Sequence, residues 1–309
     1  MTITRSRRKL LDAATAIRLD PDKTEAAFIA RQLVQATLPH KNPSDGLEEW
    51  VRTNGNLTLS IRPGRATDPK TGERKSTGYP YGSLPRLLLF WMTTEALRTG
   101  KPRLELGKSL AEFMRELGLN PDNGSAGAKR SDARRLRDQM QRLFRATISF
   151  DQVKGGKQSW LDMQIAPEGV LWWDDKQPYQ PALWDSWIEL SPQFFRAITA
   201  TPVPVDMRAL KALKRSPLAL DLYAWATYTA YQTKQSGQPR LVSWESLHEQ
   251  FGGDYDEIRN FQAKAWTALH KIQTVYPDLG IERIRGGVKV LPCNPAITIT
   301  PSKRQKAVD

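Results

Sequence analysis

The chain has 309 residues, which is long enough for two domains of roughly 100 to 150 residues each. It is 39% hydrophobic and 26% charged, and no window approaches the roughly 18 uninterrupted apolar residues of a membrane span, so we expect a water-soluble protein. Lysine and arginine (46) outnumber aspartate and glutamate (33), and the formal net charge of +13 favours a polyanionic partner, foremost nucleic acid.

The start of the chain and its cysteine content bear on the compartment. MTITRSRRKLLDAATAIRL carries positive charge but has no continuous apolar stretch followed by small residues, so it does not predict a secretory signal. We therefore expect a cytoplasmic protein. Cys293 stands alone, which rules out an internal disulfide and a multi-thiolate zinc site. We interpret it as an unreactive core thiol.

Residues 1–78 are interpreted as an N-terminal accessory segment with a basic beginning. The hydrophobic pattern predicts helices near residues 10–19 and 24–38, and the alternating NLTLSI from Asn56 predicts a strand. Residues 62–78 are rich in glycine, proline and charge, which predicts an exposed loop. We expect this loop to mark the boundary between the N-terminal segment and the domain that begins at residue 79.

Residues 79–204 open the first of two similar patterns. Ser83 is a plausible cap for a helix that is apolar around most of its circumference and therefore buried. A strand-like RLEL follows. Ser109 and Glu112 then form a capping box before FMRELGL, and Gly118 closes that helix.

The same pattern continues with a glycine-containing loop and a helix over residues 131–145. TISFDQ and SWLDMQIA then alternate like two strands joined at Gly155 and Gly156. Helix, strand, helix, helix, hairpin is the order of elements in a winged helix. We predict a winged-helix domain here.

Residues 205–309 repeat this order. A mostly apolar helix begins at Ser216, RLVSW reads as a strand, and Ser246 with Glu249 repeats the capping pattern. A Gly-Gly turn precedes a long helix over residues 256–275, and GIERIR, GG and VKVLP predict a hairpin. We therefore predict an α+β protein with two tandem winged-helix domains in pseudo-repeat, at 79–204 and 205–309, the second with a basic tail.

A tryptophan-rich connector lies between the two copies and contains Trp172, Trp173, Trp184 and Trp187. Aromatic faces can stack on the bases of single strands, but the neighbouring aspartates repel phosphate. We expect these rings to pack at the interface between the domains.

The third helix of the first copy carries the strongest local signal, KRSDARRLRDQMQRLFR. Its basic and amide residues recur at helical spacing beside the apolar face of Leu136, Met140 and Leu143, as a recognition helix requires. Guanidinium forks can bond guanine edges in the major groove. The predicted DNA-binding residues are Lys129, Arg130, Arg134, Arg135, Arg137, Gln141 and Arg142. The alternative is a solvated basic face, which Asp132 and Asp138 would balance only in part.

The equivalent helix of the second copy has a weaker, mixed polar face. The predicted contacts on it are Asn260, Lys264, Thr267 and Lys271. Asparagine can pair with adenine, and lysine with guanine or phosphate. The following hairpin adds Arg283, Arg285 and Lys289 as a wing that could reach the DNA backbone, with plain solvated surface as the alternative.

Catalytic patterns are missing from the sequence. The histidines are scattered, with neither a histidine metal cluster of the relaxase kind nor an HExxH zinc helix. GSAGAKRS lacks the register of a phosphate loop, and adjacent acids such as Asp174 and Asp175 point to opposite faces of a strand. We expect neither an enzyme nor a metal or cofactor.

Long segments nevertheless resemble one family. TNGNLTLSI, YPYGSLPRLLLFWMTTEALRTGKPRLELGKSLAEFMRELGL and RRLRDQMQRLF look like the plasmid-encoded RepA replication initiators. SPQFFRAI, PVDMRALKALKRSPLALDLYAWATY and SWESLHEQF are similar to later parts of the same family, and the likeness covers roughly residues 50 to 300.

The resemblance implies binding to repeated double-stranded origin sequences (iterons), help in opening adjacent A+T-rich DNA, and recruitment of the host initiator and helicase. Related initiators also repress their own genes as dimers and initiate as monomers. The resemblance implies no catalytic residues in this chain. Two alternatives remain open, a transcriptional repressor of the same fold and a DNA-processing enzyme such as a relaxase or primase. The tandem repeat favours the initiator, because two joined units let one chain read successive major grooves.

Overall fold

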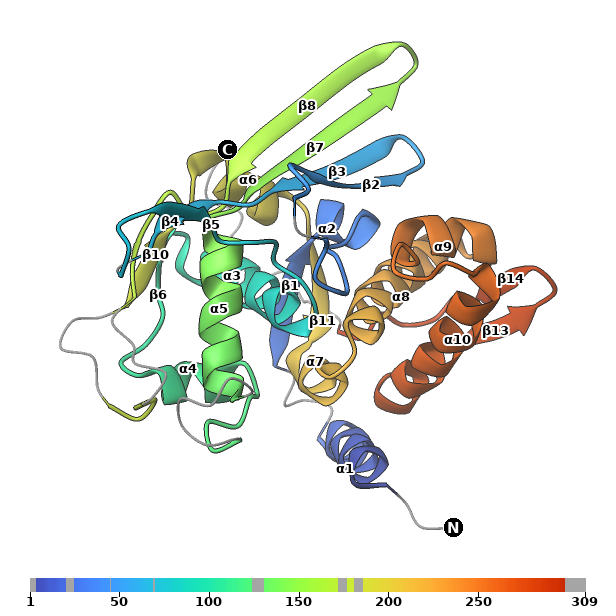
Figure 1. Ribbon diagram of the computed structural model, residues 1–309. Helices are drawn as coiled ribbons and strands as arrows, with labels where there is room; N and C mark the ends of the chain where they lie inside the picture. The colour runs from blue at the N-terminus through green and yellow to red at the C-terminus, as the bar shows by residue number, and fades with distance from the viewer. Residues whose placement is uncertain are drawn as a thin grey trace, which may run out of the picture.

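The structure is a computed structural model that describes residues 4–20, 25–44, 46–68, 70–123, 131–171, 177–180 and 186–297. Within these residues the fold is mixed α and β, with helices packed around five small sheets whose strand pairs are all antiparallel. Figure 1 shows the first unit around α3 and α5 and the second around α8 and α10. The predicted α+β class is confirmed at this level.

The first unit has the predicted order of elements. They are α3 (Ser83–Thr99), β6 (Arg103–Glu105), α4 (Leu110–Glu116), α5 (Asp132–Phe144), β7 (Thr147–Lys154) and β8 (Lys157–Gln164). The hairpin β7–β8 turns at Gly155 and Gly156, whose φ angles of 57° and 78° suit glycine. Gly118 follows α4 with a φ of 71°, as its predicted closing role requires.

The second unit repeats this order. Its elements are α8 (Pro217–Ser236), β12 (Arg240–Ser243), α9 (Trp244–Phe251), α10 (Ile258–Val275), β13 (Ile281–Ile284) and β14 (Gly287–Val290). Strand β14 lies between β12 and β13, so the hairpin returns beside the strand that precedes α9 and α10.

The sheets of the first unit are built differently. Strand β10 (Trp187–Glu189) lies between β6 and β9 (Glu168–Val170), so β6 does not pair with the hairpin. The hairpin instead joins two strands of the N-terminal segment in the order β2-β3-β7-β8. In Figure 1 this four-stranded sheet projects away from the helices, with β7 and β8 reaching furthest.

The N-terminal segment is woven into both units. Its elements are α1 (Arg5–Leu19), β1 (Ala26–Ala30), α2 (Arg31–Gln35), β2 (Trp50–Asn54), β3 (Leu57–Arg62), β4 (Arg65–Thr67) and β5 (Arg74–Ser76). Helix α1 packs on α7 (Met207–Leu213) and α10, and β1 pairs with β11 (Pro202–Asp206). The segment therefore supports both halves of the molecule.

Two predictions for this segment are corrected. The helix expected over residues 24–38 is largely strand β1 followed by the short α2, because AAFIA pairs along its length with β11 and tertiary pairing overrides local helix propensity. The predicted loop over residues 62–78 stays mostly exposed but contains the paired strands β4 and β5.

Two predicted helix caps also lie elsewhere. Helix α3 begins at Ser83, its cap position is Gly82, and no side chain caps its first amides. Helix α9 is capped by Ser243, whose hydroxyl accepts a hydrogen bond from the amide of Ser246, so the cap lies three residues before the predicted one. Ser243 and Ser246 could both cap a helix by their residue type. Ser243 is the cap because strand β12 ends there and α9 begins at the next residue.

The connector between the units holds β9, β10, α6 (Pro192–Ala200), β11 and α7. Trp187 lies in β10 and packs under the guanidinium of Arg103, 3.9 Å from the ring centre. Because Arg103 belongs to the neighbouring strand β6, this contact lies within one sheet. Trp172, Trp173 and Trp184 lie outside the described residues.

One continuous hydrophobic core joins the segments. Buried side chains run in contact from Ala14 of α1 to Val290 of β14 and include Phe113, Tyr223 and Phe261. Cys293 is half-buried against this core with a free thiol. The packing explains how elements far apart in sequence hold α5 and α10 in place.

Candidate nucleic-acid interface

Helix α5 has one buried and one polar side. Ala133, Leu136, Met140 and Leu143 are buried in the core, as the spacing predicted. Five residues on the opposite arc are exposed and two are half-buried. The exposed ones are Arg134, Arg135, Asp138, Gln141 and Arg145, and the half-buried ones are Arg137 and Arg142.

Local chemistry fixes where this helix begins. The hydroxyl of Ser131 accepts a hydrogen bond from the amide of Arg134 at 3.3 Å, which caps the first turn. Asp132 adds an acid near the positive end of the helix dipole. The buried amide oxygen of Gln139 accepts a hydrogen bond from the amide of Tyr81 at 2.9 Å, which ties the middle of α5 to the chain before α3.

The predicted contact residues on α5 have different surroundings. Arg134 lies on the exposed face and Arg137 beside it, half-buried. Arg135 lies on the flank of the helix and forms an ion pair with Asp132 at 3.4 Å. Lys129 and Arg130 lie outside the described residues. The exposed part of the helix is therefore centred on Arg134 and Gln141.

Arg142 is engaged within the protein. Its guanidinium bonds Asp138 at 2.9 Å, Asn42 at 3.2 Å and the carbonyl of Tyr79 at 3.3 Å. It also lies 5.4 Å from the ring centre of Tyr81. These contacts hold the chain before α3 against α5, and they leave the side chain less available to DNA than its position in the sequence indicated.

The hairpin β7–β8 adds charge that the sequence prediction did not include. Lys154 and Lys157 face each other at the turn, and both are exposed. Trp160, on β8, is 69% exposed on the projecting part of the sheet. The sequence could have indicated this charge, because two lysines flank the Gly-Gly turn just as basic residues flank the turn predicted as a wing in the second unit.

Helix α10 presents its four predicted residues on one side. Asn260, Lys264, Thr267 and Lys271 are all exposed, while Phe261, Ala265, Leu269 and Ile272 are buried. The Thr267 hydroxyl donates to the carbonyl of Ala263 at 2.8 Å. The structure thus brings these four residues together, as the spacing predicted.

The three predicted residues of the second hairpin have separate surroundings. Arg285 is exposed beside the turn at Gly286 and forms no ion pair with a described residue. Lys289 pairs with Glu282 at 3.5 Å. Arg283 packs over the rings of Trp244 and Trp266, at 5.8 and 5.9 Å from their centres. Arg285 is therefore the most accessible cation of this hairpin.

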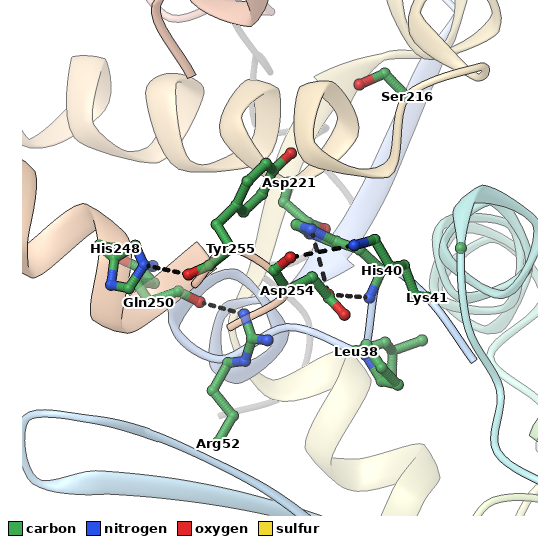
Figure 2. A network of polar contacts seen from close by, with 12 residues as sticks. Leu38, His40, Lys41, Arg52, Ser216, Asp221, His248, Gln250, Asp254 and Tyr255 are labelled. Atoms are coloured by element: carbon green, nitrogen blue, oxygen red, sulfur yellow. Dashed lines mark hydrogen bonds and ion pairs between the residues drawn. The ribbon is translucent and has the colours of Figure 1, made fainter. Parts of the chain in front are cut away.

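A buried polar network connects the two units. Arg86 of α3 binds Asp221 of α8 through two hydrogen bonds of 2.7 and 2.8 Å, and both side chains are buried. His40 donates from its Nε2 to Asp221 at 2.9 Å, and the amide of His40 donates to the carboxylate of Asp254, also at 2.9 Å. The same network holds the N-terminal segment against the second unit (Figure 2).

A second set of contacts extends this network. Arg52 of β2 donates to the carbonyl of Gln250 at 3.2 Å, and the Gln250 side chain donates to the carbonyl of Val34 at 2.7 Å. Figure 2 shows Arg52 and Gln250 beside the His40 group. The network therefore fixes α9 and the loop before α10 to the N-terminal segment.

Burial sets the charge states within the network. Burial alone would raise the pKa of Asp221, but the charge of Arg86 and the hydrogen bonds from His40 and Arg86 lower it to about 2. For His40, burial is the largest influence and lowers its pKa, although the bond to Asp221 opposes this. Asp221 is therefore a carboxylate held between the charged Arg86 and a neutral His40.

Among the described residues, no group of three or more histidine, cysteine, aspartate or glutamate side chains is placed to hold a metal ion. In the same part of the chain, no helix is long and apolar enough to cross a bilayer.

The geometry defines a mixed α and β protein with two similarly ordered units, each presenting one polar helix and one basic hairpin. A family model described as plasmid encoded RepA protein matches residues 79–246, more than half of the chain. The chain therefore belongs to the plasmid-encoded RepA family, the replication initiators of plasmids, as the resemblance predicted. A search of curated proteins found no significant match. The family match includes α5 but ends before α10.

Proposed function

We propose that this initiator binds repeated duplex sequences at its plasmid origin through two winged-helix units. The observation that carries the proposal is the polar face of α5, where arginines and Gln141 oppose a fully buried apolar side. A helix anchored in this way can enter the major groove and place guanidinium groups against guanine edges. Arg134 and Arg137 are assigned to base edges.

The arrangement of the second unit supports the winged-helix assignment. Two helices follow β12, and the hairpin β13–β14 returns so that β14 pairs with β12. In this arrangement α10 is the reading helix and Arg285 at the hairpin turn meets the DNA backbone. Domain boundaries near residues 79 and 205 remain part of this proposal.

We assign the first unit as an enlarged winged helix. It keeps the same order of elements, but β10 is inserted beside β6 and strands β2 and β3 widen the hairpin sheet. Lys154 and Lys157 then stand where a wing meets phosphates. The wider sheet carries the wing further from the helices than in the second unit.

Family membership supports the wider role. We propose that bound protein helps to open A+T-rich DNA, recruits the host initiator and helicase, and acts in the cytoplasm without catalysing a reaction or using a cofactor. Self-association into dimers belongs to the same proposal. Opening of the origin and recruitment of host proteins both require origin binding first, so origin binding is the property to test.

The test compares an origin fragment of the plasmid that encodes the gene with a shuffled duplex of equal length. We expect preferential binding to the origin fragment and a steep loss of affinity as salt rises, because several phosphate counterions are released. Fluorescence anisotropy across a salt series measures both. Equal affinity for the two duplexes, or affinity that barely changes with salt, would overturn the proposal.

A second measurement tests whether both units bind. Truncation after residue 205 is a poor test because β1 and β11 pair and the core is continuous. We instead expect replacement of Asn260, Lys264 and Lys271 by alanine to shorten the footprint on origin DNA by about one helical turn. An unchanged footprint in the folded variant would restrict binding to the first unit.

A further inference from the structure

A basic cleft lies between the N-terminal helix and the two units. It has a volume of about 790 Å³ and is open to solvent. Its walls come from α1, the beginnings of α3 and α5, the loop after α4, and α7 with the residues that follow it. The lining cations are Lys9, Arg135, Arg208, Lys211, Lys214 and Arg215.

Acidic residues offset only part of this charge. The lining acids are Asp12 and Asp132. Arg135 pairs with Asp132, Arg208 with Asp206, and Lys211 with Glu25. The other three cations, Lys9, Lys214 and Arg215, form no ion pair with any acid in the described part of the chain. The cleft therefore holds positive charge without a partner.

Lys214 shows the consequence of this crowding. Its side chain is half-buried and donates a hydrogen bond to the carbonyl of Gly118. Burial, followed by the nearby charges of Lys9 and Arg215, lowers the pKa of Lys214. An anion in the cleft would relieve this repulsion and favour the charged lysine.

The beginning of α3 adds to the positive field. Ser83 and Leu84 start α3, whose first amides have no side-chain cap, and they line the cleft. Backbone amides at the beginning of a helix bind phosphate groups well, and here they reinforce a cluster of cations. The first turn of α5 also lines the cleft, but Ser131 caps it and it carries Asp132.

A smaller cavity of about 260 Å³ beside α5 adjoins the cleft. Ser83, Leu84, Arg135 and Arg215 line both spaces. The combined groove therefore follows the flank of α5, beside the face that is assigned to base edges. When a helix occupies a major groove, the DNA backbone runs along its flank.

We propose that this cleft binds a chain of phosphates, with Lys9, Lys214 and Arg215 as its principal contacts. Two sources have this chemistry. The backbone of a duplex bound by α5 is one, and that source rests on the proposed function. A free polyphosphate is the other, and it does not depend on DNA binding.

The test uses the full chain with Lys9→Gln and Arg215→Gln combined. Both side chains are exposed and form no ion pair with a described residue, so the fold should survive the change. The matched control combines Lys101→Gln and Lys234→Gln, which removes the same charge at the far ends of α3 and α8, roughly 25 Å along each helix from the cleft. Melting curves check that both variants fold.

The first arm measures sodium tripolyphosphate binding by calorimetry at fixed ionic strength. The second measures how affinity for the origin fragment changes with salt. If the phosphates are free, the cleft variant should bind tripolyphosphate at least tenfold more weakly than the control variant. If they belong to DNA, the slope of log K against log salt should fall by about two relative to the control.

A change in either arm supports the proposal and identifies the source. If the cleft variant matches the control in both arms, the proposal is overturned. Wild-type protein that fails to prefer the origin fragment would instead reject the proposed function, while the tripolyphosphate arm would still decide the role of the cleft.

Discussion

Helices α5 and α10 occupy equivalent places in their units but differ in chemistry. The outer side of α5 is dominated by arginines, whereas the predicted face of α10 has one amide, one hydroxyl and two lysines. Arginine presents a planar fork that can recognise guanine bidentately, while lysine acts as a compact point charge. Within the proposed function, this difference predicts that the first unit selects sequence and the second mainly adds affinity.

The two helices are also held differently. Gln139 and Arg142 tie α5 to the chain before α3. The loop before α10 is tied to the N-terminal segment through Asp254 and His40. Their relative position therefore depends on the buried network around Asp221, which contacts both α3 and the N-terminal segment.

We expect the largest effect on stability when the buried network around Asp221 is broken. Asp221→Ala leaves Arg86 buried without its carboxylate, and breaking a buried pair in this way typically costs about 3 to 5 kcal/mol. We expect a loss of that size in the free energy of unfolding by urea titration. Asp278→Ala, at an exposed position, serves as the control. A loss below about 1 kcal/mol would show that the network does not join the units.

The next prediction separates selection from affinity. Arg134→Ala and Arg137→Ala should each reduce discrimination between origin and shuffled duplex by about 1 to 3 kcal/mol, because bidentate contacts to guanine are lost. Asn260→Ala with Lys264→Ala should instead weaken binding to both duplexes more evenly. Competition binding at one salt concentration measures the ratio. If the α10 variant loses more discrimination, the roles of the helices are reversed.

A smaller effect compares the ends of α3 and α8. Gly100 and Gly237 close these helices with the same φ of 67°, and a Cβ at either position would meet open space. Gly100→Ala and Gly237→Ala should therefore each destabilise the protein by about 1 to 2 kcal/mol through backbone strain alone. Thermal unfolding measures both. Clearly unequal losses would argue that the two helix ends are not equivalent.

The smallest prediction concerns pH. Because burial lowers the pKa of His40 below its ordinary 6.5, the unfolded chain binds this proton more readily than the folded one. Stability is then fully present above about pH 6.5 and falls as pH drops toward the folded pKa, by at most about 1.4 kcal/mol per unit. Urea unfolding at pH 7.5, 6.5 and 5.5 checks the slope.

The control for this slope is a second histidine. His40→Gln should flatten the pH dependence, while His270→Gln, at an exposed position on α10, should leave it in place. If both variants follow the wild type, another group is responsible for any change with pH.

Local signals were sufficient for α5 and for both hairpins. The Ser131 cap and the spacing of Leu136, Met140 and Leu143 predicted the helix and its buried side, and Gly-Gly pairs predicted both turns. These features depend on residues that are close together in sequence. For the same reason, the sequence predicted that four polar residues of α10 lie on one face.

Features built from distant segments could not be predicted. Strand β1 looks helical by itself, and only β11 explains its conformation. Arg86 and Asp221 are 135 residues apart, and no pattern within either helix marks the pair. The cleft likewise draws its cations from several segments, although the run KALKRSP, which contains Lys211, Lys214 and Arg215, was a visible sign of local charge.

The pairing of β1 with β11 has a consequence for synthesis of the chain. The first strand is complete at Ala30, but its partner ends at Asp206. At about 5 to 20 residues per second, the ribosome needs roughly 9 to 35 s to supply that partner. During this interval AAFIA lacks the partner that fixes it as a strand, and its apolar side chains are uncovered, which favours association with other chains. Nascent protein should therefore depend on chaperones until translation has passed residue 206, about two thirds of the way along the gene.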